Sequence, residues 1–140
     1  MIVLDTSVVL AFMNRGDRRH EEVAAWVDRL DDDLVTTPLA VAEMDHLVSR
    51  SGGQRAAQRL RADLSSGAYA VAWWPEALAE TLTVAERHES FPLGLTDASL
   101  VALAAHLETT AVATLDERHF RTVRPLGGEA AFTLLPSDKA

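Results

Sequence analysis

Four acidic residues of this chain stand where folding could bring their carboxylates to one place. Asp5 closes the apolar run of residues 1–4, and Asp116 follows the apolar segment 111–115. Both segments have the pattern of buried parallel strands, and parallel sheets bind ligands outside the carboxyl ends of their strands. We therefore expect the Asp5 and Asp116 side chains to lie near each other at that edge.

The other two acids, Glu43 and Asp97, lie on apolar faces of predicted helices. Glu43 shares an i±4 row with Leu39 and Leu47, and Asp97 lies on the side of Leu100. Each of the four acids also has a structural explanation, which in chain order is a helix cap, a buried ion pair, a helix-dipole partner and a turn residue. Their shared placement favours a common chemical function.

Several carboxylates aimed at one spot need a positive charge between them. Two carboxylates about 4 Å apart repel each other by roughly 4 kcal/mol at an effective dielectric constant of about 20. A divalent ion or an incoming arginine would relieve that repulsion, and oxygen ligands alone select Mg²⁺ or Mn²⁺. The chain has no cysteine, which excludes a Cys-ligated zinc site, and its five histidines show no zinc-binding spacing.

The charge distribution limits where nucleic acid could bind. The net charge of −8 argues against a broad phosphate-binding surface. Lys139 is the only lysine, so nearly all positive charge is arginine, and ten of the twelve arginines fall in three clusters: residues 15–19, 50–61 and 118–124. We expect most of these arginines to be solvated on helix faces. The first and last clusters each follow one of the four acids, so Arg15 and Arg118 are the first candidates for holding a phosphate backbone.

Size and composition indicate one ordinary globular domain. Of the 140 residues, 48% are hydrophobic and 24% are charged. No stretch approaches the roughly 18 apolar residues of a membrane span, and the apolar start of the chain lacks the basic lead-in of a signal peptide. We expect a cytoplasmic protein without a membrane segment, with a single domain over residues 1–135 and a frayed tail over residues 136–140.

Strand and helix patterns alternate along the chain, which predicts an α/β fold with a mostly parallel sheet between helix layers. Apolar, β-prone runs predict strands at 1–4, 34–36, 68–74, 109–115 and 131–135. Helical periodicity and capping residues predict helices at 8–13, 18–30, 38–50, 54–65, 75–87 and 98–107, with a short helical turn at 117–120. We expect Thr37 and Thr96 to cap two of these helices, Gly52 and Gly53 to break one, and residues 89–94 to form a loop.

Four segments together resemble the PIN-domain ribonucleases, and most closely the VapC toxins of toxin–antitoxin systems. They are IVLDTSVVLAF, TTPLAVAE, LTDASLVALA and TLDERHF, in that order along nearly the whole chain. The resemblance implies a three-layer α/β/α sandwich with a five-stranded sheet. It also implies Mg²⁺- or Mn²⁺-dependent cleavage of RNA, a homodimer, and inhibition by a VapB-type antitoxin.

Within this resemblance the motif acids correspond to Asp5, Glu43, Asp97 and Asp116 as catalytic residues. The metal would be held by three of them, Asp5, Asp97 and Asp116. Supporting hydroxyls would come from residues next to the first and last motif acids, namely Thr6, Ser7 and Thr114. No motif residue is missing, so the resemblance implies an active enzyme.

Two other functions fit parts of the pattern. A phosphoryl-transfer enzyme with an aspartyl-phosphate would also place an acid at the end of the first strand. Such enzymes need a second acid near Asp5 and a lysine beside the phosphoryl group, whereas this chain has Ser7 and only the tail residue Lys139. A non-catalytic module would instead use the acidic groove to dock a basic peptide. Metal-dependent RNA cleavage would distinguish a ribonuclease from such a module.

Overall fold

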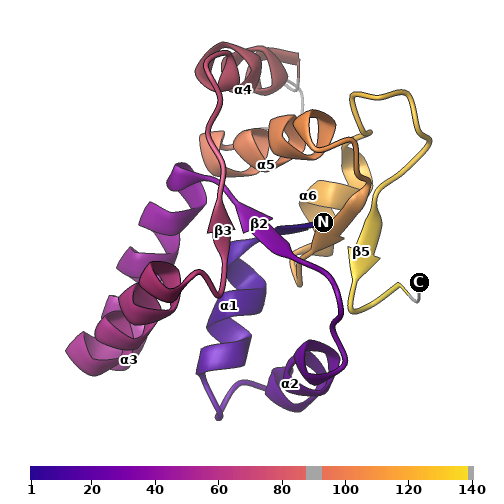
Figure 1. Cartoon of the computed structure of the whole chain (residues 1–140). Helices are drawn as coiled ribbons and strands as arrows, with labels where there is room; N and C mark the ends of the chain where they lie inside the picture. The colour runs from indigo at the N-terminus through magenta and orange to yellow at the C-terminus, as the bar shows by residue number, and fades with distance from the viewer. Residues whose placement is uncertain (88–92, 139–140) are drawn as a thin grey trace.

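The computed structural model describes residues 1–87 and 93–138, and within them five strands form one parallel sheet (Figure 1). The strand order is β3-β2-β1-β4-β5, and all four neighbouring pairs are parallel. The strands are β1 (Ile2–Leu4), β2 (Leu34–Thr36), β3 (Ala70–Val71), β4 (Ala111–Ala113) and β5 (Thr133–Leu135). The prediction of an α/β sandwich with a five-stranded sheet is confirmed.

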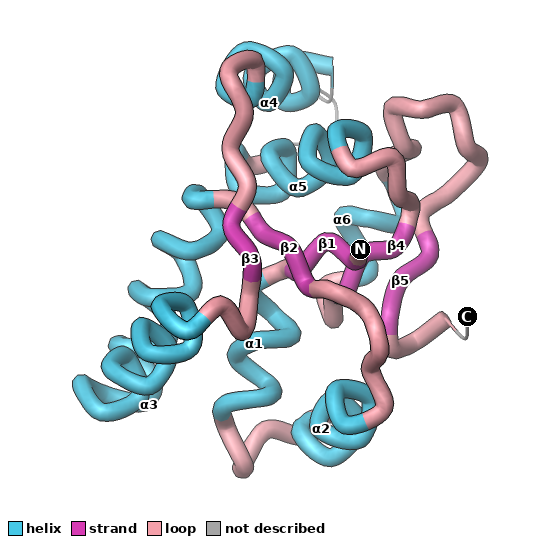
Figure 2. The backbone as a smooth tube through the Cα atoms, in the orientation of Figure 1, coloured by secondary structure: helices cyan, strands magenta, loops and turns pink. Residues whose placement is uncertain are grey.

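Helices cover both faces of this sheet. They are α1 (Thr6–Met13), α2 (His20–Asp28), α3 (Pro38–Ser66), α4 (Ala77–Arg87), α5 (Leu95–His106) and α6 (Glu117–Thr122). Figures 1 and 2 show α1, α2 and α3 on one side and α5 on the other, with α4 packed outside α5. The three central strands are nearly all apolar, and burial on both faces accounts for that composition. No helix within residues 1–87 and 93–138 is both long enough and apolar enough to cross a membrane.

The long helix α3 consists of two arms joined at Gly53. Thr37 caps the first arm by accepting a hydrogen bond from the Ala40 N–H at 3.3 Å, as predicted. Gly53 has φ +77° and ψ −170°, a conformation open to glycine and strained for other residues, so the predicted break is confirmed. The second arm folds back, and its Arg61 guanidinium donates to both carboxylate oxygens of Asp45 at 2.7 and 2.9 Å.

Several predicted boundaries differ from the structure. The strand β2 has the predicted bounds, whereas the other four strands are shorter than predicted, above all β3, which has two residues where seven were expected. Thr96 is not a helix cap, because α5 already begins at Leu95 with Gly94 in the cap position. The tail is bound as far as Asp138, whose carboxylate accepts from the Leu134 N–H at 2.8 Å and from Arg121. Most of the predicted loop 89–94 lies outside the described residues, and the domain boundary at residue 135 stays a prediction.

Candidate active site

Asp5 lies at the carboxyl end of β1, with its carboxylate directed into the protein. Its backbone N–H donates to the Ala113 carbonyl at 3.0 Å, which continues the pairing of β1 with β4. The side chain is only 5% exposed, and its Oδ2 accepts hydrogen bonds from Ser7 Oγ (2.8 Å) and Thr114 Oγ1 (2.7 Å). Asp5 occupies the N-cap position of α1, but its side chain makes no capping hydrogen bond there.

The two hydroxyls that hold Asp5 also join the ends of two strands. Ser7 Oγ accepts from the Leu115 N–H at 2.9 Å, and Thr114 Oγ1 accepts from the Asp116 N–H at 3.0 Å. Each hydroxyl therefore donates to Asp5 and accepts from the chain after β4. Of the three supporting residues expected from the sequence, Ser7 and Thr114 contact Asp5 with their side chains, whereas the buried Thr6 hydroxyl has no hydrogen-bond partner among the described residues.

Asp97 and Asp116 meet at the ring of a histidine that the sequence analysis did not select. Asp97 lies in the first turn of α5, and Asp116 precedes α6. His119 Nδ1 lies 2.9 Å from Asp97 Oδ2 and 3.0 Å from Asp116 Oδ2. The i, i+3 spacing of Asp116 and His119 at the start of α6 could have indicated this contact. Zinc-binding spacing does not reveal His119, because the partners of its ring are carboxylates.

The acids of the site perturb one another's ionisation. The pKa of Asp97 is raised to about 6, chiefly by burial and then by the charge of Asp5; Asp116 and Glu43 add to the increase, and His119 opposes it. The pKa of Asp5 is also raised, because burial outweighs the opposing hydrogen bonds from Thr114 and Ser7, and the charge of Glu43 adds a smaller increase. Such mutual effects require short separations. The four carboxylates therefore share one region of the molecule.

The donor set of this region fits a hard divalent cation. All four acids offer oxygen, and a cation among them would offset the mutual repulsion that adds to the effect of burial on the pKa of Asp97. In the part of the chain that the structure describes, no group of three or more acid, histidine or cysteine side chains is arranged so that it could hold a metal ion as it stands. Instead, the His119 ring lies between Asp97 and Asp116.

The two arginine candidates lie at different places relative to this region. Arg118 is exposed on α6, next to His119 and two residues after Asp116. Arg15 lies beyond the far end of α1, an eight-residue helix that leads away from Asp5 over about 12 Å. The fold therefore brings Arg118 to the edge of the site and leaves Arg15 apart from it.

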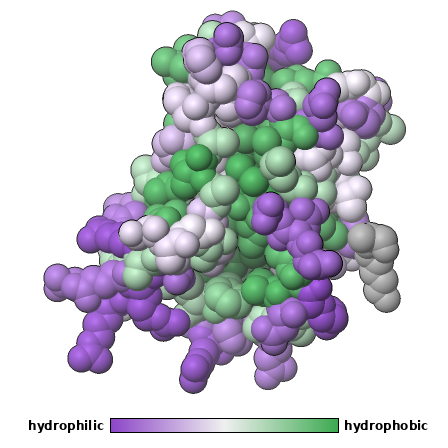
Figure 3. Space-filling view, in the orientation of Figure 1, coloured by the Kyte–Doolittle hydropathy of each residue, from purple (hydrophilic) through white to green (hydrophobic). Residues whose placement is uncertain are grey.

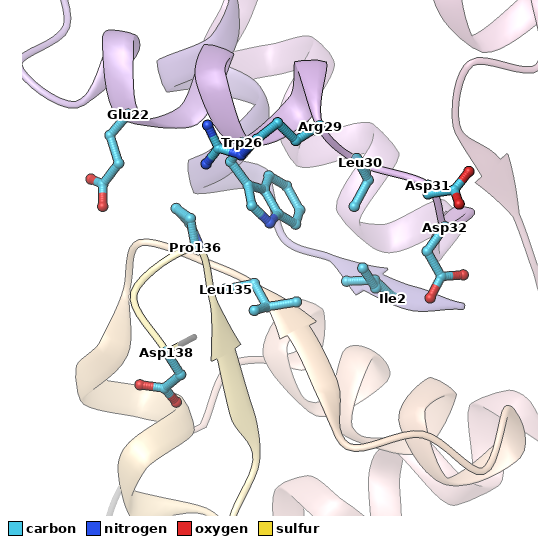
Figure 4. A pocket seen from close by; sticks show the side chains of 10 residues that line it. All are labelled: Ile2, Glu22, Trp26, Arg29, Leu30, Asp31, Asp32, Leu135, Pro136 and Asp138. Carbon is cyan, nitrogen blue, oxygen red and sulfur yellow. The ribbon is translucent and has the colours of Figure 1, made fainter. Parts of the chain in front are cut away.

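A separate cavity lies beside α2 and does not involve the four acids (Figure 4). Its volume is about 710 Å³, and Figure 4 shows the Trp26 ring facing it opposite Leu135 and Pro136. Three of its acids already have cationic partners, as Glu22 pairs with Arg19, Asp32 with the N-terminal amine and Asp138 with Arg121. The cavity thus offers no second cluster of uncompensated carboxylates.

Comparisons with known proteins agree with this geometry. Residues 2–125 match the family model of the PIN domain. The ribonuclease VapC26 of Mycobacterium tuberculosis is 33% identical over 136 residues, which cover 96% of this chain and all of that protein.

Solved structures share the fold. VapC20 of Mycobacterium tuberculosis, described as a toxin that cleaves the sarcin–ricin loop, has a TM-score of 0.78 at 24% identity and covers 89% of this chain and 100% of its own. FitAcB of Neisseria gonorrhoeae has a TM-score of 0.57 at 25% identity and covers 83% of this chain and 88% of its own. The chain therefore belongs to the PIN-domain family and, within it, to the VapC ribonucleases.

Proposed function

We propose that this protein is a metal-dependent endoribonuclease that acts as the toxin of a VapBC-type toxin–antitoxin pair. The observation that carries the proposal is the convergence of Asp5, Glu43, Asp97 and Asp116; burial, together with the charges of the other three acids, raises the pKa of Asp97 to about 6. The 33% identity to a ribonuclease over nearly the whole chain supports the same reaction class. The substrate is RNA, and the reaction is hydrolysis of a phosphodiester bond.

In this proposal Asp5, Asp97 and Asp116 hold Mg²⁺ or Mn²⁺, directly or through water, and Glu43 orients the attacking water or binds a second ion. When bound, such an ion lowers the pKa of water and stabilises charge on the phosphoryl oxygens. Ser7 and Thr114 keep the Asp5 carboxylate in one orientation through their hydrogen bonds at 2.8 and 2.7 Å.

The RNA backbone needs cationic contacts close to these acids. Arg118 is the better placed of the two sequence candidates, because α6 starts at the site and the side chain is exposed. Arg15 would contact RNA only at a distance from the scissile bond. A guanidinium fork binds phosphate oxygens in pairs and thus offsets their repulsion by the acids.

The proposed partners are a VapB-type antitoxin and a second copy of the chain. An antitoxin with a basic segment would be attracted by the acidic site. Large apolar side chains are exposed along β3, α4 and the start of α5, and they supply a candidate dimer surface: Val71, Trp73, Leu78, Leu82 and Leu95. We place this pair in the cytoplasm.

The test is RNA cleavage by purified variants. Asp5→Asn and Asp97→Asn are expected to abolish cleavage of total RNA while circular dichroism stays unchanged, and EDTA is expected to stop the wild-type protein. Asp28→Asn, which removes an exposed acid of α2, serves as the control and should cleave normally. Full activity in either site variant would remove that carboxylate from the mechanism. RNA or peptide binding without EDTA-sensitive cleavage would favour the non-catalytic module.

A further inference from the structure

One acid-free stretch of α3 carries four arginines in a chain that is otherwise acidic. Residues 46–62 contain no aspartate or glutamate, whereas the whole chain has a net charge of −8. The arginines are Arg50, Arg55, Arg59 and Arg61. Figure 3 shows strongly hydrophilic side chains projecting from the region of α3 at the lower left of the view. This surface is the part of the helix layer that extends furthest from the sheet in Figure 1.

The structure divides these arginines into two groups. Arg61 is used internally, because its guanidinium is bound in a bidentate manner by Asp45 and fixes the second arm of α3 against the first. Arg50, Arg55 and Arg59 are exposed. Within residues 1–87 and 93–138, no carboxylate lies within ion-pair distance of these three side chains.

The free arginines of the second arm are aligned on its outer face. Arg55 and Arg59 are four residues apart, so they lie one above the other on the same side of the helix. The opposite side carries Ala57 and Leu60, which are 2% and 0% exposed and face the core. Packing of that side therefore orients both guanidinium groups outward.

The first arm connects these charges to the acidic site. Glu43 and Arg50 are seven residues apart, which is two turns, so they lie on one face of the helix at a separation of about 10 Å along its axis. The positive surface therefore begins on the helix that carries one of the four site acids. It continues past Gly53 onto the second arm.

We propose that Arg50, Arg55 and Arg59 form a phosphate-binding surface for the RNA strand on its way to the acidic site; we refer to it as the arginine track. The inference rests on the proposed ribonuclease function, because the strand that enters the site is the one that the track would hold. The acids repel phosphate, so affinity for RNA has to come from cationic groups outside the site. Three arginines spaced along a helix suit an extended polyanion, and each guanidinium fork matches a phosphate.

The test is RNA binding as a function of salt in the presence of EDTA, so that no cleavage is required. The probe is a fluorescein-labelled single-stranded oligoribonucleotide of mixed sequence, followed by anisotropy. Each phosphate contact to a single strand contributes about −0.7 to the slope of log K against log salt concentration. The triple variant Arg50→Gln/Arg55→Gln/Arg59→Gln is therefore expected to bind roughly tenfold to a hundredfold more weakly at about 0.1 M salt, with a slope smaller by about 2.

The matched control removes the same number of charges from other exposed positions, with the substitutions Arg18→Gln, Arg29→Gln and Arg87→Gln. Its salt slope should stay close to that of the wild type. Equal losses in both triple variants would overturn the track and leave only a general charge effect. If the triple variant Arg50→Gln/Arg55→Gln/Arg59→Gln bound RNA like the wild type but no longer bound an acidic protein, that result would also overturn the track.

Cleavage kinetics provide a second readout and separate this inference from the proposed function. On a long RNA the track variant should raise KM and leave kcat unchanged. On a dinucleotide, whose single phosphate is the scissile one and cannot also lie on the track, both constants should match the wild type. A fall in kcat on the dinucleotide would contradict the track. A wild type that binds RNA through these arginines but cleaves none would instead refute the ribonuclease proposal and leave the track in place.

Discussion

The Asp5 carboxylate owes its orientation to two hydroxyls from different elements, and this arrangement predicts a cost for removing either one. Thr114→Val keeps the shape of a fully buried side chain but deletes the donor to Asp5 and the acceptor of the Asp116 N–H. Because a buried polar group then lacks a partner, we expect the metal-free protein to lose about 1–3 kcal/mol of unfolding free energy. Urea denaturation measures this loss.

Thr83→Val is the matched control for that substitution. The Thr83 hydroxyl donates only to the Ala79 carbonyl of its own helix and is exposed. We expect a change within about 0.5 kcal/mol. An equal loss in the two variants would mean that the hydroxyl pair on Asp5 contributes nothing particular to stability.

Asp97 should make the stability of the metal-free protein depend on pH in a defined direction. Its pKa is about 6 in the folded protein against an ordinary value of 3.8, so the folded state binds the proton more tightly. Ionisation therefore destabilises the fold as pH rises from about 4 through 6, and the full cost is present above 6. Asp97→Asn removes this cost and should become more stable relative to the wild type by about 1 kcal/mol between pH 4.5 and 7.5, an amount reduced for partial exposure.

Urea denaturation in EDTA at those two pH values measures the difference. Asp28→Asn, an exposed acid on α2, is the control and should show no such trend. A wild-type-minus-variant difference that stays constant across the range would show that Asp97 ionises without opposing folding.

The place of a site residue could be predicted where the neighbouring sequence determines the direction of its side chain. The four acids could be found because each follows or lies within an apolar segment that fixes its direction. His119 was missed, because its role depends on the contact of α6 with the start of α5, which no local pattern reports. The separation of Arg15 from the site has the same origin, since it depends on the direction in which α1 leaves the sheet.

At the scale of elements, Gly53 should be the position where α3 tolerates substitution least. Its φ of +77° requires glycine, and a Cβ added there meets nothing within 4 Å, so any cost comes from the backbone alone. We expect Gly53→Ala to lower the unfolding free energy by about 1–3 kcal/mol. Gly16→Ala is the control, because Gly16 lies in an exposed turn without a positive φ.

Urea denaturation of both glycine variants tests this expectation. If Gly53→Ala and Gly16→Ala proved equally stable, the two arms of α3 would not need the turn that the structure shows. The pair of Arg61 and Asp45 offers an independent check, because it can form only while the second arm folds back.

The type and order of the helices and strands were predicted better than their first and last residues. The alternation of apolar runs with helical periodicity predicted the parallel sheet, because each layer must bury one face against the next. Thr96 looked like a cap because threonine often is one, yet the cap position lies two residues earlier, at Gly94. The short β3 has two exposed residues at the edge of the sheet, where burial no longer sets the length of a strand.

At the scale of the whole molecule, the sheet order explains why acids far apart in sequence meet. β1 lies between β2 and β4, so the end of β1 is flanked by the starts of α3 and α6. The start of α5 reaches the same edge, where Thr37 and Ser99 contact each other through their hydroxyls at 2.7 Å. Each of these junctions carries one acid of the site. Their convergence is thus a property of the topology rather than of any one segment.

That convergence predicts how the whole protein responds to metal. Folding brings mutually repelling carboxylates together, and the unfolded chain separates them, so Mn²⁺ should bind the folded state alone. At a concentration about 100 times its Kd, such a ligand adds about 2.7 kcal/mol to the unfolding free energy. For a chain of this size, that amounts to a rise in Tm of roughly 6–10 °C. Scanning calorimetry of the protein in EDTA and in Mn²⁺ measures the shift. Asp5→Asn/Asp97→Asn should lose most of it, and an equal shift in that double variant would place the ion elsewhere on the acidic surface.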